Sequence, residues 1–157
     1  MSKTRKIFAI LLSFTILLTL IFIWGNSLKT VTESGEQSSE AFNLLTPLLN
    51  LIFGEGTITH STFRKLAHVF EYFVLGVQVF ALILVVKGLK WITLLLGLPF
   101  GIFVGVIDEC LQLISKRGAS VTDVFIDLIG FILSGVIMAI LTLIIKSKIN
   151  KKYRNRF

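Results

Sequence analysis

Long apolar segments constrain the fold of this chain more than any other feature. The hydrocarbon core of a bilayer is about 30 Å thick, and an α-helix crosses it in roughly 20 residues. Three segments, 7–25, 62–86 and 121–145, meet this standard, and a fourth, 91–112, comes close but contains Pro99. Proline is tolerated inside a membrane helix when neighbouring groups satisfy the freed carbonyl. We therefore predict an all-α membrane protein with four transmembrane helices, of which the third is kinked.

The composition supports a membrane location. The chain is 54% hydrophobic and contains 14 Phe among 157 residues, which is more than an ordinary soluble domain of this size carries. This length predicts one domain spanning residues 1–157. The net charge of +7 would suggest nucleic acid as a partner in a soluble protein, but the basic residues flank apolar segments. We attribute them to membrane topology and expect membrane lipids, not nucleic acid, as partners.

The first apolar segment has two possible readings. Basic residues precede it, as they precede a signal peptide, but its roughly 18 apolar residues exceed the usual 7 to 15 of a signal-peptide core. The sequence that follows, WGNSLK, offers no good small-x-small cleavage site. We therefore favour an uncleaved helix. The sole cysteine, Cys110, excludes an intramolecular disulfide, and we expect it to pack in the core.

Basic residues divide unevenly between the two sides of the predicted bundle. Eleven of the sixteen lie on the side of the two termini: Lys3, Arg5, Lys6, Lys87, Lys90, Lys146, Lys148, Lys151, Lys152, Arg154 and Arg156. The positive-inside rule predicts that both termini and the basic tail 146–157 are cytoplasmic. On the outer side, the loop 26–60 ends in an apolar part, AFNLLTPLLNLIF, that is too short to span. We expect this part to form a short interfacial or re-entrant helix.

Ionisable residues interrupt the second predicted helix on one face. Arg64, His68 and Glu71 fall within an arc of about 80°, with Lys65 and Tyr72 at its edge. The third and fourth helices carry similar polar stripes, built from the small and polar residues Gly97, Gly101, Gly105, Asp108 and Gln112, and Asp123, Asp127, Gly130 and Ser134, respectively. Small residues at this spacing let another helix approach closely.

These stripes should turn inward and meet. A charge near the centre of a bilayer costs about 2.5 to more than 10 kcal/mol, so such residues usually pair inside a bundle. Four bases would then face five acids, which predicts a mutually paired network: Arg64, Lys65, Lys116 and Arg117 with Glu71, Asp108, Glu109, Asp123 and Asp127. Two interpretations remain open. The network is either a structural clasp or a polar cavity that opens outward and binds or transforms a ligand.

Candidate catalytic residues lie within this network. His68 and Glu71, one turn apart, have the chemistry of an acid–base pair, while Glu71 merely holding His68 in place is the alternative. Asp108 or Glu109 would position a substrate or a metal. His68 and the three acids could ligate a divalent ion, but the chain has no HExxH motif and no repeated ligand pair. We therefore assign no metal ligand and no cofactor.

Arg117 lies in the short loop before the fourth helix. Ser120 or Thr122 can cap that helix, and a helix N-terminus beside an arginine is a candidate anion site. The alternative is that Arg117 pairs with Asp123 or Asp108.

Three motifs in order, RKLAHVFEYFVLG, DECLQ and RGASVTDVFIDLIG, resemble the VanZ-like family, named for a protein associated with teicoplanin resistance. The resemblance implies a small multi-pass protein of the bacterial plasma membrane. Some members are linked to lowered susceptibility to glycopeptides or lipoglycopeptides, so the resemblance also implies action at the cell envelope. The motif positions it implies are Arg64, His68, Glu71, Tyr72, Asp108, Glu109, Gln112, Arg117, Asp123 and Gly130. The sequence departs from the family at Asp127, where Asn is usual.

Three functional hypotheses follow. The first is a protein that binds a lipid-linked or cell-wall component, or a glycopeptide, through Arg64, Tyr72, Gln112, Arg117, Asp123 and Asp127. The second is a membrane-embedded enzyme that acts on a lipid-linked or cell-wall substrate through acid–base chemistry by His68 and Glu71. The third is a partner subunit whose glycine face on the third helix binds another membrane protein.

Overall fold

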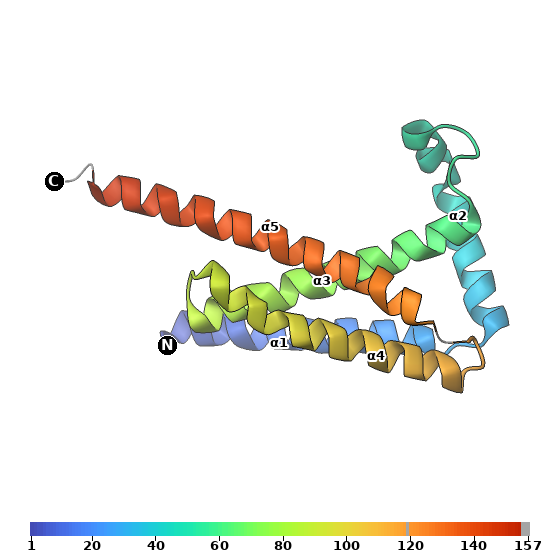
Figure 1. Ribbon diagram of the computed structural model, residues 1–157, viewed down its shortest axis with the longest axis horizontal. Coiled ribbons are helices and arrows are strands. Elements are labelled where there is room, and N and C mark those ends of the chain that lie inside the picture. The colour runs from blue at the N-terminus through green and yellow to red at the C-terminus, as the bar shows by residue number, and fades with distance from the viewer. Residues whose placement is uncertain (119, 155–157) are drawn as a thin grey trace.

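The computed structural model describes residues 1–118 and 120–154, which form helices and no strands (Figure 1). The elements are α1 (Lys3–Ser27), α2 (Val31–Phe53), α3 (His60–Lys87), the 3-10 helix η1 (Trp91–Gly97), α4 (Leu98–Ile114) and α5 (Val121–Arg154). Four segments are long and apolar enough to cross a membrane: α1, α3, η1 joined to α4, and α5 up to Lys152. The predicted all-α membrane fold with four spans is therefore confirmed. Arg156, at the end of the basic tail, lies outside the described residues.

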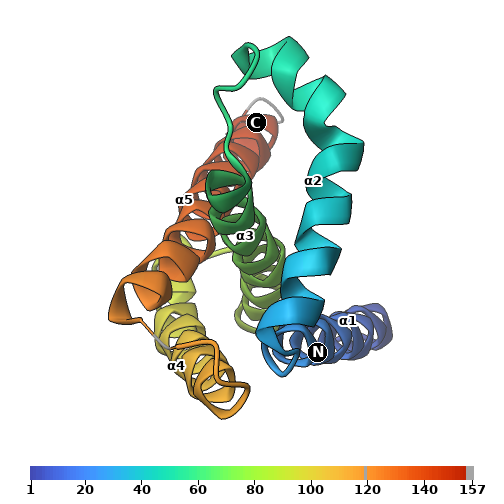
Figure 2. The ribbon, with the colours of Figure 1, turned by 90° about the vertical axis from the view of Figure 1, so that its right-hand side faces the viewer.

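The four spans run along one long axis (Figure 1). We call the end that carries α2 and the 115–120 loop the α2 end, and the opposite end, where the described chain begins and ends, the terminal end. In the middle of the bundle, α3 packs against α1, η1 and α5 (Figure 2). Large apolar side chains, such as Phe14, Phe103 and Phe125, are exposed on the outer faces of the spans. Such faces suit contact with lipid.

The glycines of the third span face the interior of the bundle. A Cβ on Gly97 would meet the ring of Phe80 at 2.5 Å, and one on Gly101 would meet the ring of Phe131 at 2.7 Å. The small residues therefore make room for aromatic rings of α3 and α5. The glycine face, which we expected to bind another membrane protein, is thus buried within the bundle in this structure.

The third span is irregular near Pro99. It begins as η1 and becomes the α-helix α4 at Leu98, so Pro99 lies in the first turn of α4. Proline fits there because the N–H groups of a first turn have no partner within the helix. The expected irregularity is thus a change of helix type at Gly97 and Leu98.

The outer loop 26–60 is more ordered than expected. We predicted a polar loop followed by a short interfacial helix, but α2 is a single helix of 23 residues that covers both parts. A capping box explains where it begins. The Glu33 N–H donates to Thr30 Oγ1 at 3.3 Å, and the Thr30 N–H donates to Glu33 Oε2 at 2.9 Å. The prediction missed the polar first part of this helix because that part lacks an apolar face.

α2 lies across the end of the bundle and contacts the start of α3 (Figures 1 and 2). His60 Nε2 lies 2.9 Å from Ser38 Oγ, and the ring of Phe42 packs against His60 and Phe63. None of the described residues of α2 is buried. Only a few side chains attach α2 to the bundle, so α2 lies on the end of the bundle and outside its core.

Candidate functional site

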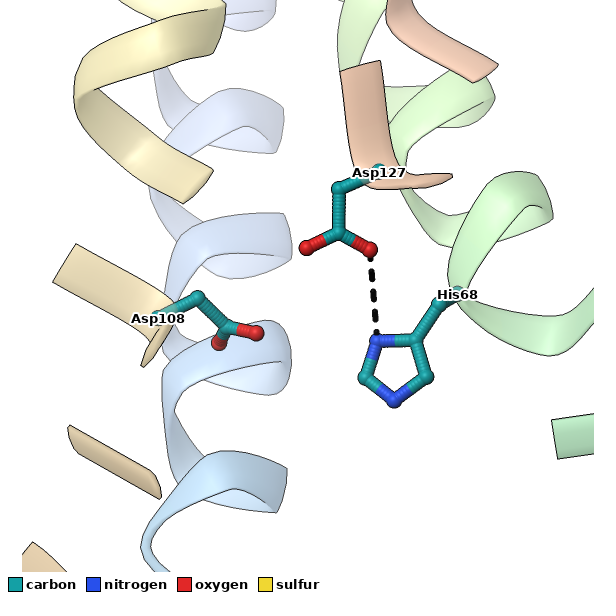
Figure 3. Close-up of side chains that lie close together, drawn as sticks. All are labelled: His68, Asp108 and Asp127. Atoms are coloured by element: carbon teal, nitrogen blue, oxygen red, sulfur yellow. Dashed lines mark ion pairs between the residues drawn. The ribbon is translucent and has the colours of Figure 1, made fainter. Parts of the chain in front are cut away.

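Three side chains from three helices meet toward the α2 end of the bundle. His68 of α3, Asp108 of α4 and Asp127 of α5 each place one nitrogen or oxygen atom within 4.8 Å of the others. Figure 3 shows the three groups directed toward one common space. The predicted convergence of the polar stripes is confirmed for these three residues. We call them the His–Asp–Asp cluster.

His68 pairs with Asp127 and not with Glu71. Its Nδ1 lies 3.5 Å from Asp127 Oδ1, and this contact is the dashed line in Figure 3. The His68 side chain is 29% exposed, whereas that of Asp127 is 2% exposed. In the described part of the chain, His68 and Glu71 share no hydrogen bond or ion pair. The predicted partner of the histidine was therefore the wrong acid, because the helix α5 supplies a closer one.

Asp108 is held from two sides. Ser27 Oγ, at the end of α1, donates a hydrogen bond to Asp108 Oδ1, and Gln112 Nε2 donates to Oδ2 at 3.1 Å. All three side chains are buried. Because these bonds come from two helices, they fix the direction in which the Asp108 carboxylate points.

Glu109 supports the loop that follows α4. The backbone N–H of Ser120 donates to Glu109 Oε2 at 2.8 Å, and Gln112 Nε2 donates to Oε1 at 3.3 Å. Ser120 Oγ in turn accepts the N–H of Thr122 at 3.1 Å, so it satisfies an N–H in the first turn of α5. These bonds give Glu109 a structural role. Cys110, which we expected in the core, is exposed.

Arg117 binds the backbone of α1. Its Nη1 donates to the carbonyl of Asn26 at 3.1 Å, and Ser115 Oγ donates to the carbonyl of Ser27 at 2.8 Å. Carbonyls in the last turn of a helix have no partner within the helix. The 115–118 loop therefore satisfies the end of α1. Burial and then the positive charge of Arg64 lower the pKa of the Arg117 guanidinium.

The predicted network of paired charges does not form. Among the described residues, His68 with Asp127 is the single ion pair. Arg64, Lys65 and Arg117 line a pocket with Asp123 and Asp127, but none of them lies within ion-pair distance of an acid. Lys116 is exposed and sits in a turn with a φ of 59°. The site contains acidic and basic side chains in similar numbers, but most of them have no ion-pair partner among the described residues.

Two adjoining pockets surround these charges. The first, which we call the polar pocket, has a volume of about 180 Å³ and includes Arg64, Lys65, His68, Gln112, Arg117, Asp123 and Asp127 in its lining. The second, the α2 pocket, has a volume of about 230 Å³ and lies between the bundle and α2. Arg64, His68 and Arg117 line both. The two pockets therefore meet at two arginines and a histidine.

A third hollow extends along the outer surface between α1 and α3. This α1/α3 groove has a volume of about 410 Å³, and apolar side chains such as Leu18 and Phe70 dominate its lining. Phe22, Ala67 and Glu71 line both the groove and the α2 pocket. The groove thus joins the polar site to the lipid-facing surface.

The structure brings together most of the predicted site residues. Arg64, Gln112, Arg117 and Asp123 line the polar pocket, and Glu71 lines the α2 pocket. Tyr72 is buried, and its hydroxyl has no hydrogen-bond partner among the described residues.

Sequence reasoning missed other residues that complete the site. They come from α1 and α2: Phe22, Ser27, Ser34, Gln37 and Ser38. The available signal was the Ser-rich stretch NSLKTVTESGEQSSE after the first helix, which contains four of these five residues.

Fold and site together define a multi-pass α-helical membrane protein with a buried polar site near one end of its bundle. A family model described as VanZ/LLP1 matches residues 7–144. The match covers the second and third spans completely, most of the first and fourth, and every residue of the His–Asp–Asp cluster. The chain therefore belongs to the VanZ/LLP1 family.

Comparison with curated proteins and with solved structures found no significant match.

Proposed function

We propose that this protein binds an anionic amphiphile of the bacterial cell envelope. The headgroup would lie near Arg64 and Arg117, and the apolar tail would lie in the α1/α3 groove. One observation carries the proposal. The polar pocket shares lining residues with the α2 pocket, and the α2 pocket shares others with the groove, so the three hollows are continuous. A site that is polar at one end and apolar at the other, and that opens toward lipid, suits a molecule with the same division.

The charge of the site supports an anionic headgroup. Arg64 and Arg117 line both pockets, and neither guanidinium pairs with an acid among the described residues. The two guanidinium charges repel each other, and a bound anion would reduce this repulsion. A phosphate or carboxylate would accept bidentate hydrogen bonds from either arginine.

The proposed orientation places this site outside the cell. The start of α1, the turn after α3 and the end of α5 lie at the terminal end (Figure 1), and these segments carry Lys3, Lys6, Lys87, Lys90 and the lysines of the tail. The positive-inside rule puts that end in the cytoplasm. The α2 end would then face outward, where cell-wall precursors and glycopeptides meet. Binding of an envelope component or of the drug itself would lower susceptibility by changing how much of the drug's target is exposed.

Lipid binding by the purified protein tests the proposal. In native mass spectrometry, the wild type should retain phosphatidylglycerol in preference to phosphatidylcholine. Arg64→Ala and Arg117→Ala should each reduce that preference about tenfold, since a charge-assisted hydrogen bond contributes about 1.5 to 3 kcal/mol. Lys90→Ala, at the terminal end, is the matched control and should leave the preference unchanged. Equal retention of both lipids by the wild type would refute the proposal.

Drug susceptibility tests the consequence for the cell. A susceptible host that expresses the wild type should tolerate more teicoplanin than one that expresses Arg117→Ala at the same level. If both hosts show the susceptibility of a host without the protein, the resistance role is refuted while lipid binding stands on its own test.

A second candidate function is catalysis, favoured by the His68–Asp127 pair. A buried carboxylate against the Nδ1 of a partly exposed imidazole leaves Nε2 free to act as a general base. Purified protein incubated with radiolabelled envelope lipids should then release a labelled product, and His68→Gln should abolish the release. His60→Gln, at the other histidine of the chain, should retain it. Equal release by the wild type and His68→Gln would exclude this function.

A further inference from the structure

Asp127 presents a buried oxygen atom without a partner. The residue is 1% exposed, its Oδ1 faces His68, and its Oδ2 has no hydrogen bond among the described residues. In Figure 3 this second oxygen points toward the side of Asp108. A buried carboxylate oxygen without a partner is unfavourable by about 1 to 3 kcal/mol or more. Its position inside the cluster therefore indicates a ligand between the three side chains.

The charge of the cluster indicates a cation. Asp108 and Asp127 place oxygen atoms within 4.8 Å of each other, and they repel when both are ionised. Ser27 and Gln112 give Asp108 neutral donors, and no lysine or arginine in the described part of the chain pairs with either acid. A divalent ion would balance both carboxylates at once.

The distances suit a single metal ion. An ion that binds nitrogen and oxygen at about 2.0 to 2.2 Å holds its ligand atoms roughly 3 to 4.4 Å apart. The separation of 3.5 Å between His68 Nδ1 and Asp127 Oδ1 is long for a hydrogen bond and falls inside this range. All ligand atoms lie within 4.8 Å of one another. A pair of atoms at the 4.8 Å limit would have to approach by about 0.4 Å to enter this range.

Neighbouring groups already orient the ligands. Ser27 and Gln112 each bond one oxygen of Asp108, and an ionised carboxylate keeps further lone pairs for a metal. Such outer partners are typical of metal sites, where they fix the direction of the first ligands. The polar pocket, lined by His68 and Asp127, leaves room for water at the remaining coordination positions.

We propose that His68, Asp108 and Asp127 bind one divalent transition-metal ion, Zn²⁺ or Mn²⁺, in preference to Mg²⁺ or Ca²⁺. The imidazole nitrogen decides the preference, because Mg²⁺ and Ca²⁺ take oxygen ligands almost exclusively. Three protein ligands and an open position are the pattern of a site where a metal binds substrate or water. The proposal goes beyond amphiphile binding and can fail without affecting it.

Metal binding by the purified full chain tests this site. Protein stripped with a chelator and titrated with Zn²⁺ or Mn²⁺ alone should bind one ion per chain, as measured by calorimetry or with a competing indicator. His68→Gln and Asp127→Asn, which nearly preserve side-chain volume, should each weaken binding at least tenfold. Mg²⁺ should bind at least tenfold more weakly than Mn²⁺. Absence of stoichiometric binding by the wild type would overturn the proposal.

Asp123→Asn is the matched control. Asp123 lines the same polar pocket but lies outside the His–Asp–Asp cluster, so its substitution should weaken metal binding far less than His68→Gln or Asp127→Asn does. An equal loss in Asp123→Asn would show that the ion responds to the charge of the pocket in general, and would overturn the assignment of ligands.

A spectroscopic measurement on the wild type keeps the test independent of whether the variants fold. Pulsed electron paramagnetic resonance of bound Mn²⁺ should show coupling to an imidazole nitrogen. The chain has two histidines, so His60→Gln should keep this coupling while His68→Gln removes it. Bound Mn²⁺ without nitrogen coupling in the wild type would exclude His68 as a ligand and overturn the proposal.

Discussion

Gly130 of α5 contacts the backbone of Val69 in α3 so closely that no Cβ fits between them. Val69 follows His68 in the chain, and Gly130 lies one helical turn after Asp127. A second close contact, between Gly76 and Ser134, lies farther along the same two helices. The approach of α3 to α5 at these glycines therefore brings His68 within 3.5 Å of Asp127. The packing of α3 against α5 thus sets the geometry of the site.

Alanine at Gly130 should separate the two helices. Its Cβ would overlap the Val69 carbonyl oxygen and lie 2.8 Å from the carbonyl carbon, and backbone atoms inside a helix have little freedom to move. Overpacking of this kind costs about 1 to 3 kcal/mol or more. We expect Gly130→Ala to lower the free energy of unfolding by this amount, as measured in mixed detergent and SDS micelles.

Gly25→Ala is the control for this prediction. Gly25 is exposed on α1, and a Cβ there would meet no atom within 4 Å. Alanine favours a helix by about 1 kcal/mol over glycine, so this variant should be as stable as the wild type or more stable. If Gly130→Ala were as stable as the wild type, the close contact with Val69 would not hold α3 and α5 together.

The fold could be predicted from the sequence because it follows from periodicity and length. Apolar segments of sufficient length fixed the four spans, and polar stripes at helical spacing predicted that His68, Asp108 and Asp127 would face one another. Both inferences depend on local geometry and on the high cost of exposing charge to lipid.

Pairing inside the site could not be predicted from the sequence. Periodicity shows which residues share a helix face, but the helix rotations and offsets decide which side chains touch. Glu71 is one turn from His68 along α3, yet the approach at Gly130 favours Asp127. The role of Ser27 depends in the same way on the position of α1 relative to α4. Such contacts can be identified only from the three-dimensional arrangement of the helices.

Ser27→Ala should loosen the join between α1 and α4. The Ser27 hydroxyl is buried and donates to Asp108, and its loss leaves the carboxylate with one donor fewer. Loss of a buried partner costs about 1 to 3 kcal/mol. Thr15→Ala is the control, because the Thr15 hydroxyl is exposed and bonds only a carbonyl of its own helix at 3.0 Å. Thermal unfolding should show a lower midpoint for Ser27→Ala alone, and equal midpoints would contradict the prediction.

Tyr72→Phe should not destabilise the ligand-free protein. The ring is fully buried, but the hydroxyl has no partner among the described residues. Removing it should leave the free energy of unfolding unchanged or raise it by up to about 1 to 3 kcal/mol. Tyr72→Ala, which also removes the ring, should cost about 3 to 5 kcal/mol. A loss of more than about 1 kcal/mol in Tyr72→Phe would instead show that the hydroxyl has a bonding partner.

The start of α2 should respond to acid through Glu33. Hydrogen bonds from the Thr30 backbone and then from its hydroxyl lower the pKa of the Glu33 carboxyl. A lowered pKa means that the cap stabilises α2 above the ordinary glutamate range and is lost as the pH falls through the folded-state value. A spin label at Glu36→Cys, in a Cys110→Ser background, should therefore become more mobile in acid. Glu33→Gln should abolish this pH response, since glutamine also serves in a capping box but does not titrate. Glu40→Gln should preserve it. Retention of the response in Glu33→Gln would assign it to another acid.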